Sequence, residues 1–204
     1  MLRYTLLPDG TSDRMLLPII DWELRKLGAV YESQVALLPI APVEERLPKV
    51  QELYPCDLLI VHRDAERESL DSRKQEITTA FQRLGLSQPS ACLIPVRMSE
   101  AWLLIDESAL RRAAGNPNGR VKLNLPPLKK LEAIPDPKAL LIDLLRSASE
   151  LKGRHLKKFQ PLVSIHRLSR LIEDFSLLNS LPAYIEFQSQ LKTAVEKVRA
   201  TKAV

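Results

Sequence analysis

The chain of 204 residues is poor in cysteine, glycine and aromatic residues, and each shortage narrows what it can be. Two cysteines are too few for the disulfide framework of a small secreted protein, and six glycines exclude collagen-like repeats. The longest stretch without a charge, Leu84 to Val96, is shorter than the roughly 20 apolar residues that cross a bilayer. The first ten residues lack the apolar core and cleavage site of a signal peptide. We therefore expect a cytoplasmic protein without membrane association, with Cys56 and Cys92 as reduced, buried thiols.

What the chain does have is the ordinary balance of a globular protein, with 45% hydrophobic and 27% charged residues. Its net charge of +5 is unevenly spread. Residues 1–100 carry 12 basic and 15 acidic side chains, whereas residues 101–204 carry 18 basic and 10 acidic ones. Residues 111–158 alone hold 12 basic against 4 acidic side chains. Two interpretations stand: a cation site beside a polyanion-binding surface, or a solvated, lysine-rich helical surface, which composition alone favours.

Short apolar runs alternate with amphipathic ones over the first 115 residues. The runs predict strands at 3–8, 34–40, 57–61 and 91–96, and helices at 13–27, 42–54, 69–84 and 99–114. Pro18 predicts a kink in the first helix or a late start of it. Four β–α units predict an α/β fold, with a mostly parallel sheet of four or slightly more strands flanked by helices.

The pattern changes after Gly115. Residues 116–137 are rich in proline and lack apolar periodicity, which is typical of a linker or an extended arm. Apolar spacing then predicts helices at 138–150, 163–175 and 182–200. We expect three parts: an α/β domain (1–115), a proline-rich linker or arm (116–137), and a basic helical C-terminal extension (138–204) that packs on the sheet domain.

Acidic residues follow three of the predicted strands. Asp9 follows the first strand, with Asp13 four residues further on; Asp64 and Glu66 follow the third strand, and Glu100 follows the fourth. Right-handed crossovers place the carboxyl ends of parallel strands at one edge of the sheet, so we expect these side chains to converge. Oxygen ligands without a histidine or thiolate set suit Mg²⁺ or Mn²⁺, ions that assist in-line attack on a phosphodiester.

Each of these acids also has a purely structural interpretation. Asp9 and Asp13 suit a turn and a helix cap, while Glu66 and Glu100 suit the solvated start of a helix. Asp64 directly follows an apolar strand, which favours a functional role for its carboxylate.

Basic residues offer candidate phosphate contacts. Arg63 lies inside the acidic motif, where it either holds a phosphate or balances the carboxylates. Lys157 and Lys158 belong to the densest basic run and contact a phosphate if that run folds over the sheet edge; the alternative is a solvated loop. For His62, a histidine at a strand end with its hydrogen bonds satisfied is favoured over a ligand. Asp106 lies about 120° away from Glu100 on a helix, which favours a structural role.

Three segments in order, LLPDGTSDRMLL, LLIVHRDAERE and IPVRMSEAWLLID, resemble the motifs of the Toprim fold. They resemble more closely a Toprim-like family of unknown function related to the nuclease domain of OLD (overcoming-lysogenization-defect) proteins. The resemblance covers roughly residues 1–110, and KALLIDLL and GRHLKKF in the tail follow it more loosely. It implies a Toprim-like fold in which Asp9, Asp64, Glu66 and Glu100 are metal ligands and catalytic residues, with Asp9 as ligand or general base. The implied cofactor is Mg²⁺, or Mn²⁺ in its place.

The resemblance implies a Mg²⁺-dependent nuclease, a metal-dependent endonuclease that hydrolyses DNA or RNA phosphodiesters in phage defence. It also implies an ATPase partner of the AAA or ABC type. Asp9 stands where the family usually has glutamate, and Glu66 where it usually has aspartate, changes that metal binding survives more readily than fast catalysis. The alternative is a catalytically degenerate interaction subunit that binds nucleic acid or an ATPase without cleaving. A third class is an enzyme that handles small phosphate compounds.

Overall fold

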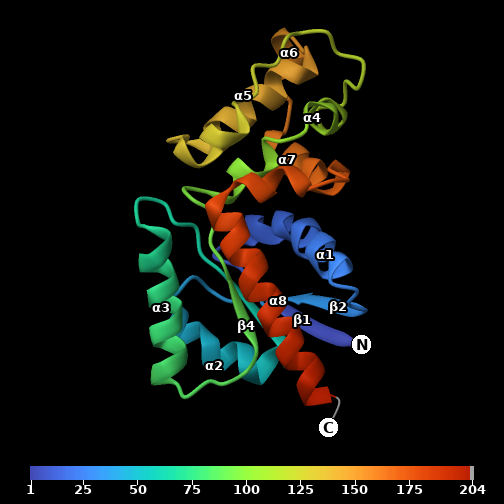
Figure 1. The fold of residues 1–204 in the computed structure, drawn as a ribbon. Coiled ribbons are helices and arrows are strands. Elements are labelled where there is room, and N and C mark those ends of the chain that lie inside the picture. The colour runs from blue at the N-terminus through green and yellow to red at the C-terminus, as the bar shows by residue number, and fades with distance from the viewer. Residues whose placement is uncertain (203–204) are drawn as a thin grey trace.

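The computed structural model describes residues 1–202 and confirms the α/β class (Figure 1). Its sheet has four strands, all parallel, in the order β2-β1-β3-β4. In the register, Leu6 of β1 lies opposite Ile60 of β3, and Val61 of β3 lies opposite Cys92 of β4. The strands are β1 (Leu2–Leu7), β2 (Tyr31–Val35), β3 (Leu58–His62) and β4 (Ser90–Leu93).

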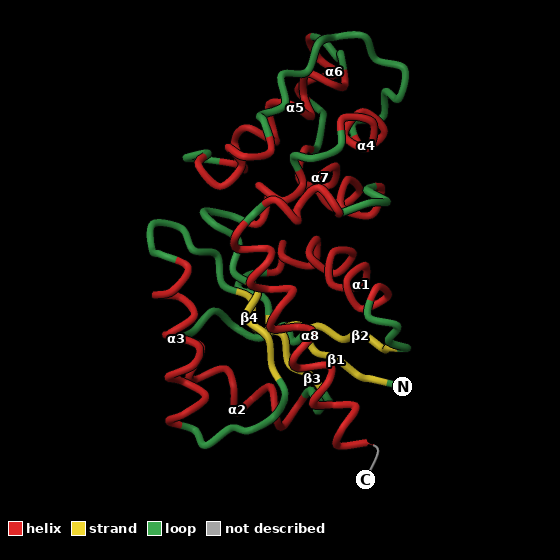
Figure 2. The backbone as a smooth tube through the Cα atoms, in the orientation of Figure 1, coloured by secondary structure: helices red, strands yellow, loops and turns green. Residues whose placement is uncertain are grey.

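Helices cover both faces of this sheet (Figure 2). Helices α2 and α3 pack on one face, and α1 and α8 pack on the other. The α-helices are α1 (Leu17–Lys26), α2 (Val43–Leu53), α3 (Leu70–Arg83), α4 (Glu107–Ala113), α5 (Pro137–Ser149), α6 (Gly153–Lys157), α7 (Pro161–Leu171) and α8 (Pro182–Lys202). The 3₁₀ helices are η1 (Thr11–Leu16), η2 (Ser99–Leu103), η3 (Leu128–Ala133) and η4 (Ser176–Ser180).

Helix α8 joins the C-terminal part of the chain to the sheet. It lies across β4 and β3, as the red helix in front of the sheet in Figure 1 shows. Its buried Tyr184 makes an edge-to-face contact with Trp102 of η2, with ring centroids 5.2 Å apart, and its hydroxyl donates to Glu23 of α1 at 2.6 Å. At its last turn, Lys202 pairs with Asp57, which immediately precedes β3, at 2.6 Å.

The predicted strand at 34–40 is wrong in its position, since β2 spans Tyr31–Val35. This strand lies at the edge of the sheet and has the sequence YESQV, with Glu32 and Ser33 exposed and its other three residues half-buried. The apolar run that suggested the strand lies beyond it, where Ile40 is 86% exposed. An edge strand has only one neighbour, so a polar sequence can form it and apolar content does not locate it.

The predicted helix at 99–114 is two helices, η2 and α4. Asp106 separates them because its carboxylate accepts the backbone N–H of Ala109 at 2.9 Å and caps α4, which confirms its structural role. The late start predicted from Pro18 is also confirmed, since a 3₁₀ turn precedes α1 and Pro18 occupies its first turn.

Helices α4 to α7 form the part of the molecule farthest from the α2 side of the sheet in Figure 1. Residues 116–137 contain η3 and contribute Leu123 and Leu131 to the same core as β1 and α8. The boundaries at 115 and 137 stay a prediction. Cys56 and Cys92 are free and half-buried. Within residues 1–202, no helix is both long and apolar enough to span a membrane.

Candidate active site at the carboxyl ends of β1 and β3

The candidate site lies where β1 and β3 end side by side. These strands are neighbours in the sheet although β2 separates them in sequence, so the chain leaves them in opposite directions. Ligands of open α/β sheets bind at such a switch point, outside the carboxyl ends of the strands. Asp9 follows β1, Asp64 follows β3, and Ser99 and Glu100 follow β4, so the predicted convergence of strand ends brings these four residues to one edge.

Asp64 is held in place by Ser99. The backbone N–H and the hydroxyl of Ser99 both donate to Oδ1 of Asp64, each at 2.9 Å. The Ser99 Oγ also lies 3.1 Å from Nε2 of His62, the fully buried last residue of β3. His62 Nδ1 lies 2.9 Å from the carbonyl oxygen of Leu93, which can only accept, so Nδ1 carries a proton and Nε2 faces the site.

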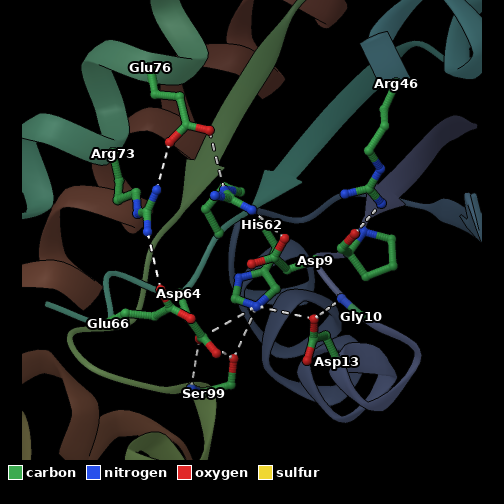
Figure 3. A network of polar contacts seen from close by, with 12 residues as sticks. Asp9, Gly10, Asp13, Arg46, His62, Asp64, Glu66, Arg73, Glu76 and Ser99 are labelled. Carbon is green, nitrogen blue, oxygen red and sulfur yellow. Dashed lines mark hydrogen bonds and ion pairs between the residues drawn. The ribbon is translucent and has the colours of Figure 1, made fainter. Parts of the chain in front are cut away.

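Asp13 completes this cluster from the other side. Its Oδ2 lies 3.4 Å from Nε2 of His62, and Oδ1 of Asp64 lies 3.6 Å from the same nitrogen (Figure 3). The backbone N–H of Gly10 donates to Oδ2 of Asp13 at 2.6 Å, which fixes the turn between β1 and η1. The buried imidazole of His62 therefore lies between two carboxylates and does not face solvent.

Burial raises the pKa of Asp64 from its usual 3.8 to about 6. His62 and the hydrogen bond from Ser99 lower the pKa, while the nearby charges of Asp13 and Glu100 raise it further. Asp13 is 5% exposed and Glu100 is 3% exposed, so both repel the Asp64 carboxylate in a place that water screens poorly. A cation entering beside Asp64 would relieve this repulsion.

Asp9 is engaged by a basic neighbour. Nη1 of Arg63 lies 2.5 Å from Oδ1 of Asp9, and Nε of Arg63 lies 3.5 Å from Glu76 of α3. Behind Asp9, the buried Arg46 donates to the carbonyl oxygen of Pro8 and supports the end of β1. Of its two predicted roles, Arg63 takes the one that balances carboxylates; its binding of a phosphate stays a prediction.

Glu66 is not brought to the other carboxylates. Its side chain is 66% exposed, and its Oε2 lies 3.4 Å from Nη2 of Arg73 on α3. Its backbone has a left-handed φ of 53°, and its N–H donates to the carbonyl oxygen of Arg97, which is also left-handed at φ 66°. The loops that follow β3 and β4 are thus tied together in a conformation that favours glycine.

Glu66→Gly is expected to be about 1 kcal/mol more stable than Glu66→Ala, because glycine adopts a positive φ without steric cost. Both variants are expected to keep the full Mg²⁺-induced rise in melting temperature, since the Glu66 carboxylate lies against Arg73. Thermal melts with and without Mg²⁺ measure both quantities. An equal loss of the Mg²⁺ effect in both variants would show that Glu66 is a ligand after all.

Glu100 and the two lysines lie in very different surroundings. Glu100 is buried in η2, and its Oε1 lies 3.3 Å from Nζ of Lys138 on α5. Lys157 and Lys158 lie in or directly after α6, are exposed, and have no ion-pair partner among residues 1–202. Figure 1 shows α6 at the end of the helical part that is remote from the strands. Their contact with a phosphate at this site stays a prediction.

The side chains present fit a Mg²⁺ or Mn²⁺ ion held by few direct ligands. No three His, Cys, Asp or Glu side chains within residues 1–202 are already arranged around one point. Mg²⁺, however, commonly binds one or two carboxylates and keeps waters or substrate phosphates as its other ligands. Asp64 and Asp13 are the two that fit, with Glu100 close enough to act on the charge of Asp64.

The chain matches no known protein-family model, no curated protein and no solved structure. The resemblance to Toprim and OLD-related proteins therefore stays a prediction that depends on three short motifs and their order along the chain.

Ser99 is the site residue that sequence reasoning missed. It has no motif around it, but it directly precedes Glu100 at the carboxyl end of β4, the same edge that carries the acids. Asp13 was weighed as a helix cap and His62 as a structural histidine, and the structure places both in contact with the cluster. Their position at the strand ends, rather than their residue type, is the feature that could have identified them.

Proposed function

We propose that this protein is a metal-dependent phosphodiesterase that hydrolyses DNA or RNA with Mg²⁺ or Mn²⁺. The observation that carries the proposal is the Asp64 carboxylate, buried at the switch point, aimed by Ser99 and next to two more buried acids. Such a group costs stability, carboxylates with a raised pKa cluster at functional sites, and ligands of parallel sheets bind at this edge.

In this proposal each side chain has a defined task. Asp64 and Asp13 would hold the ion, and hydrogen bonds from Ser99 and from the Gly10 N–H fix the direction of their oxygens. The metal, when bound, would polarise the phosphate and favour attack by water. Asp9, 25% exposed, would accept a proton from that water once Arg63 moves from its Oδ1 to a substrate phosphate, and the oxygen that leaves the phosphorus would take its proton from solvent.

The substrate class follows from charge. Residues 111–158 carry 12 basic against 4 acidic side chains, a surplus that attracts a polyanion. A cytoplasmic location, a role in phage defence and an AAA or ABC-type ATPase partner extend this proposal from the family resemblance.

A second candidate is a non-cleaving subunit that binds nucleic acid or an ATPase. Two contacts favour it: Asp9 is ion-paired with Arg63, and Glu66 lies against Arg73. Both acids are the ones that the family motif would use, and both differ from the usual residue type at their positions.

The test is cleavage of supercoiled plasmid, linear duplex and single-stranded RNA in Mg²⁺, Mn²⁺ or EDTA. We expect cleavage that EDTA abolishes and that Asp64→Asn slows at least ~100-fold, since even changes outside the ligand shell cost 10- to 100-fold. Asp143→Asn is the matched control, because Asp143 is 74% exposed on α5. Unchanged cleavage by Asp64→Asn would refute the site. No cleavage, with Mg²⁺ still raising the melting temperature of the unmodified chain, would select the second candidate.

A further inference from the structure

Beside the candidate site lies a groove of about 590 Å³ that the acids do not use. It runs between η1 and α1 on one side and α7 on the other, segments about 150 residues apart in sequence that pack together. Thr11, which opens η1, and Val35, which ends β2, both line it. The groove therefore opens at the same carboxyl edge of the sheet as the site, displaced from β3 toward β2.

The groove is positively charged. Arg14 of η1 and His166 and Arg170 of α7 line it, and none of these three side chains has an ion-pair or hydrogen-bond partner within residues 1–202. This contrasts with Arg63 and Arg73 nearby, which are both paired with acids.

One carboxylate lines the groove, and it already accepts a hydrogen bond. Asp21 accepts the hydroxyl of Tyr4 at 2.7 Å, and among residues 1–202 it forms no ion pair with Arg14 or Arg170. The two arginines of the groove therefore have no ion-pair partner among the described residues, and the groove is suited to an external anion.

The spacing of the basic side chains suits a chain of phosphates rather than a single one. His166 and Arg170 lie four residues apart, so they stand one above the other on the same face of α7. Arg14 faces them from the other wall, on the 3₁₀ helix whose Asp13 points to His62. A strand leaving the site past η1 would meet positive charge at successive phosphates.

The chemistry of the lining points to backbone contact. The guanidinium groups of the two arginines and the Thr11 hydroxyl bind phosphate oxygens well, while no Phe, Tyr or Trp side chain lines the groove to stack a base. We infer that the groove formed by Arg14, His166 and Arg170 binds the sugar–phosphate backbone of the nucleic acid that flanks the cleaved bond. The inference rests on the proposed function for its substrate class, and it places the phosphate contacts away from Lys157 and Lys158.

The test is binding of a fluorescein-labelled 20-mer, single-stranded or duplex, to the full chain in EDTA, where no cleavage occurs. Arg14→Gln/Arg170→Gln is expected to weaken binding at least ten-fold and to reduce the slope of log K against log salt by about two, one per lost phosphate contact. Arg154→Gln/Arg167→Gln is the matched control, because it removes the same charge from exposed residues of α6 and α7 outside the groove. The control is expected to bind within about two-fold of the unmodified chain and to keep its slope.

Equal binding by the groove variant and the control would overturn the inference, and so would an oligonucleotide that binds no more tightly than inorganic phosphate. Both arginines of the groove are exposed, so the melting temperature should stay the same and a folding defect would be visible. The result is independent of the cleavage test. Equal binding by the groove variant and the control, with cleavage by the native chain intact, refutes the groove alone. Weakened binding by the groove variant, with no cleavage by the native chain, refutes the enzyme and keeps the groove.

Discussion

Asp64→Asn is expected to stabilise the metal-free protein at pH 8 by up to about 3 kcal/mol. Burial raises the pKa of Asp64 from 3.8 to about 6, and two pKa units correspond to about 2.7 kcal/mol. Because the folded pKa is the higher one, the folded state binds more protons between those two values. The native chain therefore loses stability as the pH rises from about 4 to about 6, and remains at the lower level above that.

Asparagine avoids this loss without changing the shape of the side chain. Its amide oxygen still accepts the N–H and the hydroxyl of Ser99, and it carries no charge to be desolvated. Urea unfolding in EDTA at pH 4 and pH 8 measures the effect, which should be absent at pH 4. Asp143→Asn, at an exposed position, should match the native chain at both values. Two results would contradict the burial of an ionised Asp64. One is an Asp64→Asn variant that is less stable than the native chain at pH 8, and the other is an equal change in its stability at pH 4 and pH 8.

Mg²⁺ should narrow the difference in stability between Asp64→Asn and the native chain. An ion that binds only the folded state stabilises it by about 2.7 kcal/mol at a hundred times its Kd. The native chain should gain this stability, and Asp64→Asn should gain little. The same substitution thus has opposite expected effects on stability and on cleavage, as is common where a site is kept at a cost to the fold.

Trp102→Ala is expected to cost about 3–5 kcal/mol, the range for deleting a large buried aromatic side chain. Trp102 is fully buried in η2 and contacts Tyr184 at 5.2 Å and Phe187 at 6.5 Å between ring centroids, both on α8. The substitution would leave a cavity between the helix that carries Ser99 and the helix that covers the sheet. Urea unfolding at pH 7 measures the loss.

Trp102→Phe separates packing from polarity. The indole N–H is buried and has no hydrogen-bond partner within residues 1–202, so phenylalanine removes an unsatisfied donor while keeping an aromatic ring. We expect this variant to lose less than half as much stability as Trp102→Ala. Leu162→Ala on α7, 56% exposed, should stay within about 0.5 kcal/mol of the native chain. A Phe variant as unstable as the Ala variant would mean that the indole N–H is satisfied.

The fold was predictable where burial is complete on both faces. The run that includes Leu58–His62 is apolar because helices cover it from both sides, and it located β3 to within a residue. Tyr31–Val35 was not located, because an edge strand needs only one paired neighbour and tolerates polar side chains. The break at Asp106 was also missed, since a capping aspartate looks like any other polar residue in an amphipathic stretch.

The sequence predicted where the candidate site lies, but not which residues form it. Strand ends located Asp64 and Glu100 at one edge, since topology alone decides where parallel strands finish. Glu66 was not excluded, because its direction depends on a left-handed backbone and on Arg73, seven residues away. Ser99 was not found, because its importance comes from two hydrogen bonds to Asp64 across 35 positions of sequence. The cationic groove depends on α7 packing against η1, which no local pattern indicates.

The position of α8 has a consequence during synthesis. Residues 1–93 contain all four strands, but the face of β3 and β4 is covered by residues 182–202. A ribosome adds about 5–20 residues per second, so the apolar face of β3 and β4 stays exposed for roughly 5–20 seconds before residues 182–202 are made. A nascent chain of this kind attracts chaperones or neighbouring chains through the bare surface. The order of the elements along the chain thus leaves one face of β3 and β4 uncovered until α8 has been made.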